Sequence, residues 1–171
     1  LSGRCLFPHR KGRIERKETV DLKNYTGTYT PSFPISARPM GEIAGYPVRP
    51  GYFEDFGATL LPVGVNFTVH THHGTSCELL LFHKGEEEPY AVLPFPASYK
   101  IGDVYSMIVF GLNIEEFEYA YRVDGPSNPR EGLLFDRKKI LLDPYARAVV
   151  GKHAWGEKLE GNYRARVVKD T

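Results

Sequence analysis

Cysteine, long apolar segments and net charge are all scarce in this sequence of 171 residues. The two cysteines, Cys5 and Cys77, lie far apart and form no CxxC pattern, which argues against a disulfide framework. The longest apolar runs, such as residues 79–82, are too short for a signal peptide or a membrane span. A net charge of +1 gives no overall attraction to nucleic acid or anionic lipid. We therefore expect a cytoplasmic protein, with neither nucleic acid nor membrane as a partner.

The charge that is present is concentrated at the amino terminus. Residues 1–23 carry seven lysines and arginines against three acidic residues, a net +4 that leaves −3 for the rest. Residues 1–42 show no helical or strand periodicity and are interrupted by proline, so we expect a basic, poorly ordered leader there. The sequence begins with Leu1, which is typical of a fragment or a processed start, and Met40 is a candidate for the natural start.

Alternation of apolar and polar residues dominates the middle of the chain. The segment "FEYAYRVDG", residues 117–125, is the clearest case, with every second residue apolar and the residues between them mostly polar. "VGVNFTVH" alternates in the same way, "SCELLLFH" is apolar on both faces, and "PYAVLPF" reads as a proline-limited edge strand. "VYSMIVF" and "KKILLDPYA" complete six short strands. With no amphipathic helix, this pattern predicts an all-β fold, an immunoglobulin-like β-sandwich of short antiparallel strands with a coil-rich N-terminal extension.

Two aspartates are the first candidates for chemistry. A glycosidase needs two carboxylates on either side of the scissile bond. However, Asp124 lies in "VDGP", where an aspartate commonly bonds to its own backbone and begins a turn. Asp143 precedes Pro144, which favours an extended strand exit. We therefore expect both aspartates to shape the backbone and no catalytic residue in the chain. The acidic run at residues 86–88 reads as a solvated turn.

The segment "HTHHG" is the candidate for a metal site. His70 and His72 alternate along a strand and can share one face, but a zinc site needs a further ligand, for which His73, His83 and Glu78 are the candidates. Since no recognised ligand spacing is matched, we expect no metal and no cofactor. The sequence also contains no GxSxG motif and no glycine-rich phosphate loop.

Aromatic residues are abundant, with one tryptophan, eleven tyrosines and ten phenylalanines. Such rings stack on the CH faces of sugars, and Trp155, in an otherwise polar segment, is the best candidate for a carbohydrate-binding residue. Tyr46, Tyr52 and Phe53 come next. The alternative is that these rings pack against a neighbouring domain.

Two paired motifs carry a family resemblance. "YAYRVDGP" is followed by "GLLFDRKKILLDPYARAV", and the motif residues are Tyr121, Arg122, Asp124, Gly125, Pro126, Asp143, Pro144 and Tyr145. Together they resemble the amino-terminal module of isoamylase-type glycogen and starch debranching enzymes, in the α-amylase superfamily. "GYPVRPG", "FGAT" and "GVNFTVH" resemble the opening of the same module. The resemblance covers residues 43–156 approximately.

The resemblance implies a family-48 carbohydrate-binding-type β-sandwich at residues 43–150, and a linker at 151–171 toward a catalytic (β/α)8 barrel. In that family the catalytic acids lie in the barrel, so none corresponds to a residue of this chain. The parent enzyme would hydrolyse α-1,6 branch linkages, with an α-glucan and the intramolecular barrel as partners. Two alternatives remain: a self-standing glucan-binding module, and an adhesion-type sandwich without a role in sugar binding.

Overall fold

A computed structural model describes residues 38–151 and 163–169 of the chain, all within the unit Phe33–Thr171. Its strands are β1 (Gly41–Ile43), β2 (Tyr46–Pro50), β3 (Gly57–Leu61), β4 (Gly64–His70), β5 (Ser76–His83), β6 (Ala91–Pro94), β7 (Lys100–Ile101), β8 (Val104–Phe110), β9 (Phe117–Asp124), β10 (Ser127–Asn128), β11 (Leu133–Leu134), β12 (Ala148–Gly151) and β13 (Tyr163–Arg166). Two short 3₁₀ helices, η2 (Ala97–Tyr99) and η3 (Pro129–Glu131), lie between them. Within the described residues, no helix is long and apolar enough to cross a membrane.

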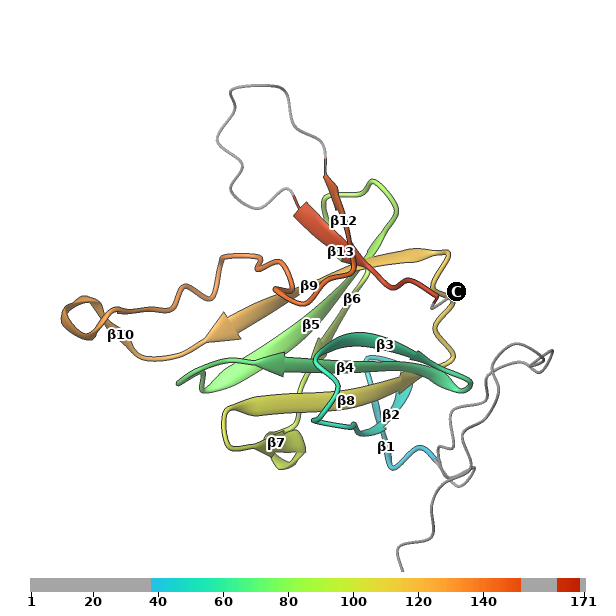
Figure 1. Cartoon of the computed structure of the whole chain (residues 1–171), viewed down its shortest axis with the longest axis horizontal. Helices are drawn as coiled ribbons and strands as arrows, with labels where there is room; N and C mark the ends of the chain where they lie inside the picture. Colours follow the sequence, from blue (N-terminus) through green and yellow to red (C-terminus); the bar gives the residue numbers. More distant parts are fainter. Residues whose placement is uncertain (1–37, 152–162, 170–171) are drawn as a thin grey trace, which may run out of the picture. The chain divides into compact units, whose positions relative to one another are not determined.

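Two antiparallel sheets make up the sandwich (Figure 1). The first sheet has the order β1-β2-β8-β4-β3, with β7 also paired to β8. The second sheet has the order β12-β13-β9-β5-β6, and β10 and β11 form a separate hairpin. The all-β sandwich expected from the alternating pattern is confirmed. The proline-limited segment forms β6 at an edge of the second sheet, as predicted.

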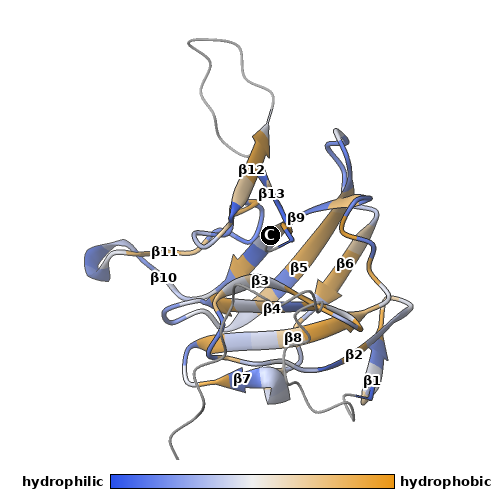
Figure 2. Cartoon of the chain, turned by 45° about the vertical axis from the view of Figure 1, so that its right-hand side comes forward, coloured by the Kyte–Doolittle hydropathy of each residue, from blue (hydrophilic) through white to orange (hydrophobic). Residues whose placement is uncertain are grey.

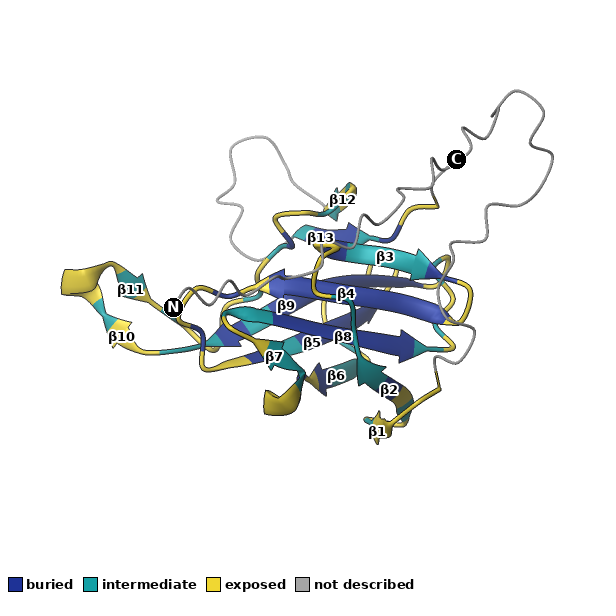
Figure 3. Ribbon diagram, turned by 60° about the horizontal axis from the view of Figure 1, so that its bottom comes forward, coloured by how far each residue is buried: buried dark blue, intermediate teal, exposed yellow. Residues whose placement is uncertain are grey.

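Aromatic and aliphatic side chains from the central strands fill the space between the sheets. The inward residues of β4, β8, β5 and β9 are Val65, Phe67, Val69, Tyr105, Met107, Val109, Cys77, Leu79, Leu81, Phe117, Tyr119, Tyr121 and Val123. The rings of Phe67 and Tyr119, one from each sheet, meet edge to face at 5.2 Å. Figure 3 shows these central strands buried, whereas β1, β10 and β11 are largely exposed. Every second residue of each central strand therefore belongs to one core.

The strand β5 is buried on its other face as well. Leu80, Phe82 and Ala120 form a second, smaller cluster there, and the guanidinium of Arg164 lies 4.0 Å from the centre of the Phe82 ring. Burial on both sides explains why "SCELLLFH" lacks the simple alternation of a half-exposed strand. Figure 2 shows β5 and β6 as strongly hydrophobic.

A loop crosses the outer face of the first sheet. The backbone N–H of Tyr52 donates to Oδ1 of Asn66 at 2.9 Å, and the Tyr52 carbonyl accepts from Nδ2 of Asn66 and from Oγ1 of Thr68. A Cβ atom at Gly51 would lie 2.2 Å from that same Oδ1 atom, so only glycine permits this approach. These bonds place the chain just before β3 and position Phe56 at the surface.

The structure corrects three expectations. Residues 163–166, expected in a linker, form β13, in which Ala165 is buried, Arg164 lies over the Phe82 ring and Arg166 bonds to Glu118. The last two residues of the expected leader, 41–42, belong to β1. "KKILLDPYA" makes only an isolated bridge, between Leu141 and Tyr121, since Pro144 ends the extended stretch.

Candidate functional site

The Asp143 carboxylate lies buried beneath the surface of the sandwich, with 1% of the residue exposed. The Tyr119 hydroxyl donates to its Oδ2 atom at 2.7 Å, and the backbone N–H of Tyr145 donates to Oδ1 at 2.8 Å. Burial raises the pKa of Asp143 above its ordinary 3.8, and these two hydrogen bonds partly offset the rise. Asp143 thus joins the turn at Pro144 to the middle of β9.

Tyr121 lies next to this aspartate but differs from Tyr119 in its hydrogen bonding. Its backbone exchanges two hydrogen bonds with Leu141, of 2.9 and 2.7 Å, which attach the segment before Asp143 to β9. Its buried hydroxyl has no hydrogen-bond partner among the described residues. Burial raises the pKa of both tyrosines, and the nearby Asp143 adds to the effect.

Asp124 holds the turn that follows β9. Its carboxylate accepts from the backbone N–H of Gly125 at 2.9 Å, and its carbonyl accepts from the N–H of Thr75. A Cβ atom at Gly125 would lie 2.7 Å from the ring of Phe135, so this ring packs directly on the glycine. Pro126 follows and lines a hollow with His72 and His73. The YRVDGP motif therefore ends in a tightly packed turn.

Arg122 contacts the strand beside it. Arg122 and Glu78 stand opposite each other in the β5–β9 register, and the Arg122 Nε atom donates to Oε2 of Glu78 at 2.8 Å. This half-buried cross-strand pair lies on the face opposite the main core. Glu78 is thereby engaged with β9 and lies apart from the histidines of "HTHHG".

The clearest exposed aromatic feature is a stacked pair, Phe56 and Tyr145, which we call the aromatic shelf. Their ring centres are 5.0 Å apart at 23°, and the residues are 40% and 50% exposed. Gly57, with φ of +90°, brings the "FGAT" turn close to the Tyr145 carbonyl. Two motifs that are far apart in the sequence thus meet at one surface. A flat pair of exposed rings can stack on a sugar or pack against another domain.

The carbohydrate-binding candidates from the sequence are distributed over several places. Trp155 lies outside the described residues. Tyr46 and Tyr52 are half-buried, and Phe53 is exposed in the loop before β3. The shelf was missed because Phe56 and Tyr145 lie in turns, where alternation gives no information about which side chains meet. His83 and Tyr90 form another stacked pair, with centres 4.2 Å apart.

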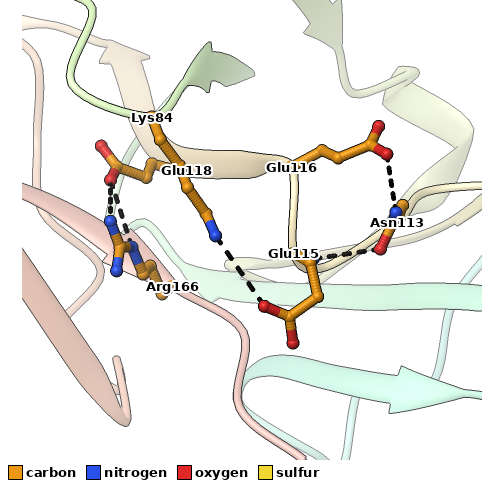
Figure 4. Close-up of polar contacts among 6 residues, drawn as sticks. All are labelled: Lys84, Asn113, Glu115, Glu116, Glu118 and Arg166. Carbon is orange, nitrogen blue, oxygen red and sulfur yellow. Dashed lines mark hydrogen bonds and ion pairs between the residues drawn. The ribbon is translucent and has the colours of Figure 1, made fainter.

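A polar hollow lies at the end of the second sheet. It has a volume of about 290 Å³ and is lined by residues of the β5–β6 turn, β9, β12 and β13. Within it, Arg166 donates to Oε1 of Glu118 through Nη2 at 2.6 Å and Nε at 3.1 Å (Figure 4). Lys84 and Glu115 form an exposed ion pair nearby, at 3.8 Å. The strong Glu118–Arg166 contact joins β9 to β13.

The histidines of "HTHHG" come together with a residue that the sequence did not single out. His70 and His72 share a surface with Asp103, from the β7–β8 turn. The three ligands considered from the sequence do not complete the same set: Glu78 pairs with Arg122, and His83 stacks on Tyr90. The His73 ring contacts that of His72 at a tilt of 50°, with centres 4.1 Å apart.

The fold and these surfaces define a small β-sandwich module with exposed aromatic rings. Residues 55–146 match the family described as Carbohydrate-binding module 48 (Isoamylase N-terminal domain). The match covers more than half of the sequence, and the chain belongs to this family. The motif residues, from Tyr121 to Tyr145, fall inside the matched residues.

Similar proteins carry related names. The chain is 37% identical over 116 residues to a glycogen debranching enzyme of Serratia proteamaculans, covering 68% of this chain and 17% of the relative. It is 33% identical over 109 residues to the chloroplastic isoamylase SU1 of Zea mays, covering 61% and 14%. Among solved structures, apo pullulanase from Paenibacillus barengoltzii aligns with a TM-score of 0.47 and 18% identity, covering 67% and 14%. The chain thus spans about one sixth of its curated relatives.

Proposed function

We propose that this chain is a non-catalytic module of a cytoplasmic glycogen-debranching glycoside hydrolase that cleaves α-1,6-glucosidic branch linkages. The observation that carries the proposal is the family match over residues 55–146, supported by relatives named glycogen debranching enzyme and isoamylase. The catalytic acids would lie in a (β/α)8 barrel encoded after this module. The residues that follow β13 would lead toward that barrel.

The two motif aspartates take scaffold roles in this proposal. Asp143 is buried and accepts hydrogen bonds from Tyr119 and Tyr145, and Asp124 accepts from the Gly125 N–H. A glycosidase acid must instead reach the leaving oxygen, with its partner carboxylate on the opposite face of the sugar. The motif therefore serves to hold the "DPYA" turn against β9, and this turn positions Tyr145.

The aromatic shelf gives the module a surface for the rest of the parent protein. Phe56, Tyr145 and the exposed Leu141 are apolar groups that a neighbouring domain would cover. An α-glucan is the proposed ligand of the whole enzyme, with Trp155 as the proposed stacking residue in this chain.

A second candidate function is a self-standing glucan-binding module without a catalytic domain. The exposed stacked rings of Phe56 and Tyr145 favour it, because paired rings offer a platform to a sugar chain. In that case the shelf would bind glucan, whereas in the preferred proposal it would be covered by the barrel.

Three measurements test these proposals. The reading frame after codon 171 should encode a barrel with its catalytic acids, and a stop codon close to that point would favour the second candidate. The purified chain should release no reducing ends from glycogen, pullulan or maltooligosaccharides. Turnover above a heat-killed control that survives repurification would contradict the scaffold roles. Glycogen binding that is tight and lost in Tyr145→Ala or Trp155→Ala would favour the glucan-binding module.

A further inference from the structure

Two turns at one end of the first sheet bring imidazole and carboxylate groups together. His70 is the last residue of β4, and His72 lies in the turn that follows. Asp103 lies in the turn between β7 and β8. One ligand atom from each of these three residues lies within 4.8 Å of the other two. The Nδ1 atom of His72 is 3.9 Å from Oδ2 of Asp103, and the rings of His70 and His72 lie 6.0 Å apart and within 20° of parallel.

We propose that His70, His72 and Asp103 bind one divalent d-block cation, with Zn²⁺ as the representative ion. Neutral imidazole and carboxylate are common ligands of Zn²⁺, whereas Ca²⁺ and Mg²⁺ prefer sites built from oxygen alone. Two imidazoles with one carboxylate therefore select the d-block class. This site does not depend on the proposed role in glucan debranching.

Backbone hydrogen bonds hold the two turns next to each other. The N–H of Thr71 donates to the Asp103 carbonyl at 2.9 Å, and its Oγ1 atom donates to the same carbonyl at 3.2 Å. His70 also stands opposite Val104 in the β4–β8 register. The ligand-bearing backbone segments are thus fixed before any ion binds, so binding need order only the side chains.

The required side-chain movement is small. Ligand atoms around a tetrahedral Zn²⁺ lie about 2.0–2.2 Å from the ion and hence about 3.3 Å from one another. From their present spacing the three groups need to close by at most about 1.5 Å. His70 and His72 are exposed and Asp103 is partly exposed, so rotation about their side-chain bonds can supply this movement.

The turn that carries His72 has a backbone conformation that residues with a side chain rarely adopt. His72 and His73 both have positive φ angles, of 24° and 66°, and the N–H of Gly74 closes the turn by donating to the Thr71 carbonyl at 3.0 Å. Residues with a side chain adopt a left-handed backbone much less often than glycine does. Asparagine or glycine would form such a turn more readily. The closed turn fixes the backbone segment that carries the proposed ligand His72.

Space remains for a further ligand. A hollow of about 620 Å³ borders the site, and His72, His73 and Glu131 are among its lining residues. The Nζ atom of Lys100, in β7, donates to the Gly74 carbonyl at 2.8 Å and so joins β7 to the turn that carries His72. Three protein ligands with an open fourth position would let water or a neighbouring donor complete the coordination.

The test is zinc titration of the 171-residue chain, produced without a histidine tag and stripped with chelator. Isothermal titration calorimetry should show one Zn²⁺ bound per chain, and saturation should raise the melting temperature because the ion binds the folded state. His70→Ala, His72→Ala and Asp103→Asn should each weaken binding by at least about tenfold. His83→Ala, which removes a histidine elsewhere on the surface, should bind zinc like the wild type.

Two results would overturn the proposal. One is the absence of saturable zinc binding to the folded wild-type chain. The other is equal binding by the wild type and a His70→Ala, His72→Ala double variant, which would place the ion on other residues. Far-ultraviolet circular dichroism and metal-free melting must show that the variants remain folded, and Asp103→Asn serves as the shape-conserving variant.

Discussion

Tyr119 and Tyr121 point into the same core, yet only the Tyr119 hydroxyl has a described partner, Asp143. Tyr119→Phe should lower the free energy of unfolding by about 2 kcal/mol, because it removes a hydrogen bond to a buried carboxylate. Tyr121→Phe should change it by less than about 0.5 kcal/mol, because the lost hydroxyl donates to no described acceptor. Urea denaturation of both variants measures the difference. Equal losses would show that the Tyr119–Asp143 bond contributes no specific stability.

Asp143 should make stability depend on pH in a defined direction. Its pKa is raised in the folded state from 3.8, so the folded chain binds more protons than the unfolded chain between those two pKa values. This contribution to the free energy of unfolding is fully present below pH 3.8 and is lost as the pH rises through the raised pKa. The free energy of unfolding of the wild type, minus that of Asp143→Asn, should therefore fall as the pH rises through this window.

Denaturation of both proteins at a series of pH values measures that difference. The amide side chain of the Asp143→Asn variant cannot ionise, so other titrating groups cancel in the comparison. A difference that grew with pH would mean that the hydrogen bonds from Tyr119 and Tyr145 outweigh burial.

The turn after β9 depends on a single small residue. Gly125→Ala should lower stability by about 1–3 kcal/mol, because the added methyl group would overlap the Phe135 ring. Gly41→Ala is the matched control, since the nearest atom to its new methyl group lies 4.0 Å away. Thermal melting of both variants should separate them. A wild-type melting temperature in Gly125→Ala would show that Phe135 can move aside freely.

The strand β13 covers one edge of β9. A chain that ends at Gly151 would lose the buried residues Ala165 and Val167, and with them the Arg166 partner of Glu118. An uncovered hydrogen-bonding edge promotes strand addition from other chains. This truncation should therefore lower solubility and melting temperature, as size-exclusion chromatography and thermal melting can measure. A chain that ends at Lys169 retains β13 and is the control; equal behaviour of the two chains would contradict this role.

The sequence predicted the strands in which apolar side chains alternate clearly. β4 and β9 were recognised because their inward positions are all apolar. β2 was missed because its five residues, "YPVRP", contain two prolines and only one buried side chain. β13 was missed because its residues include two arginines, whose charged groups reach Phe82 and Glu118 on the sheet.

The candidate sites were less predictable than the strands. Asp103 joins His70 and His72 only through the β4–β8 register, and that register is a property of the sheet. The stacking of Phe56 on Tyr145 likewise depends on the meeting of two turns. Local sequence patterns indicate which residues face inward, but they do not identify which loops meet.

At the scale of the whole module, the aromatic shelf should make the isolated chain self-associate. Phe56→Ser combined with Tyr145→Ser should reduce this association, because an exposed pair of rings favours contact between apolar surfaces. Leu134→Ser is the control, since Leu134 is 73% exposed but lies in the β10–β11 hairpin. Analytical ultracentrifugation over a range of concentrations measures the effect. Equal association of both variants would show that the shelf is not the contact surface.

The late position of β13 in the sequence has a consequence for synthesis on the ribosome. β9 is made well before the strand that pairs with its edge, and Tyr119 meets Ala165 only when the last described strand emerges. Translation adds about 5–20 residues per second, so the edge of β9 stays unpaired for several seconds before β13 is made. During this interval the unpaired edge of β9 could pair with a strand of another nascent chain on the same polysome. Slow codons within residues 152–166 would lengthen that interval and lower the yield of folded protein.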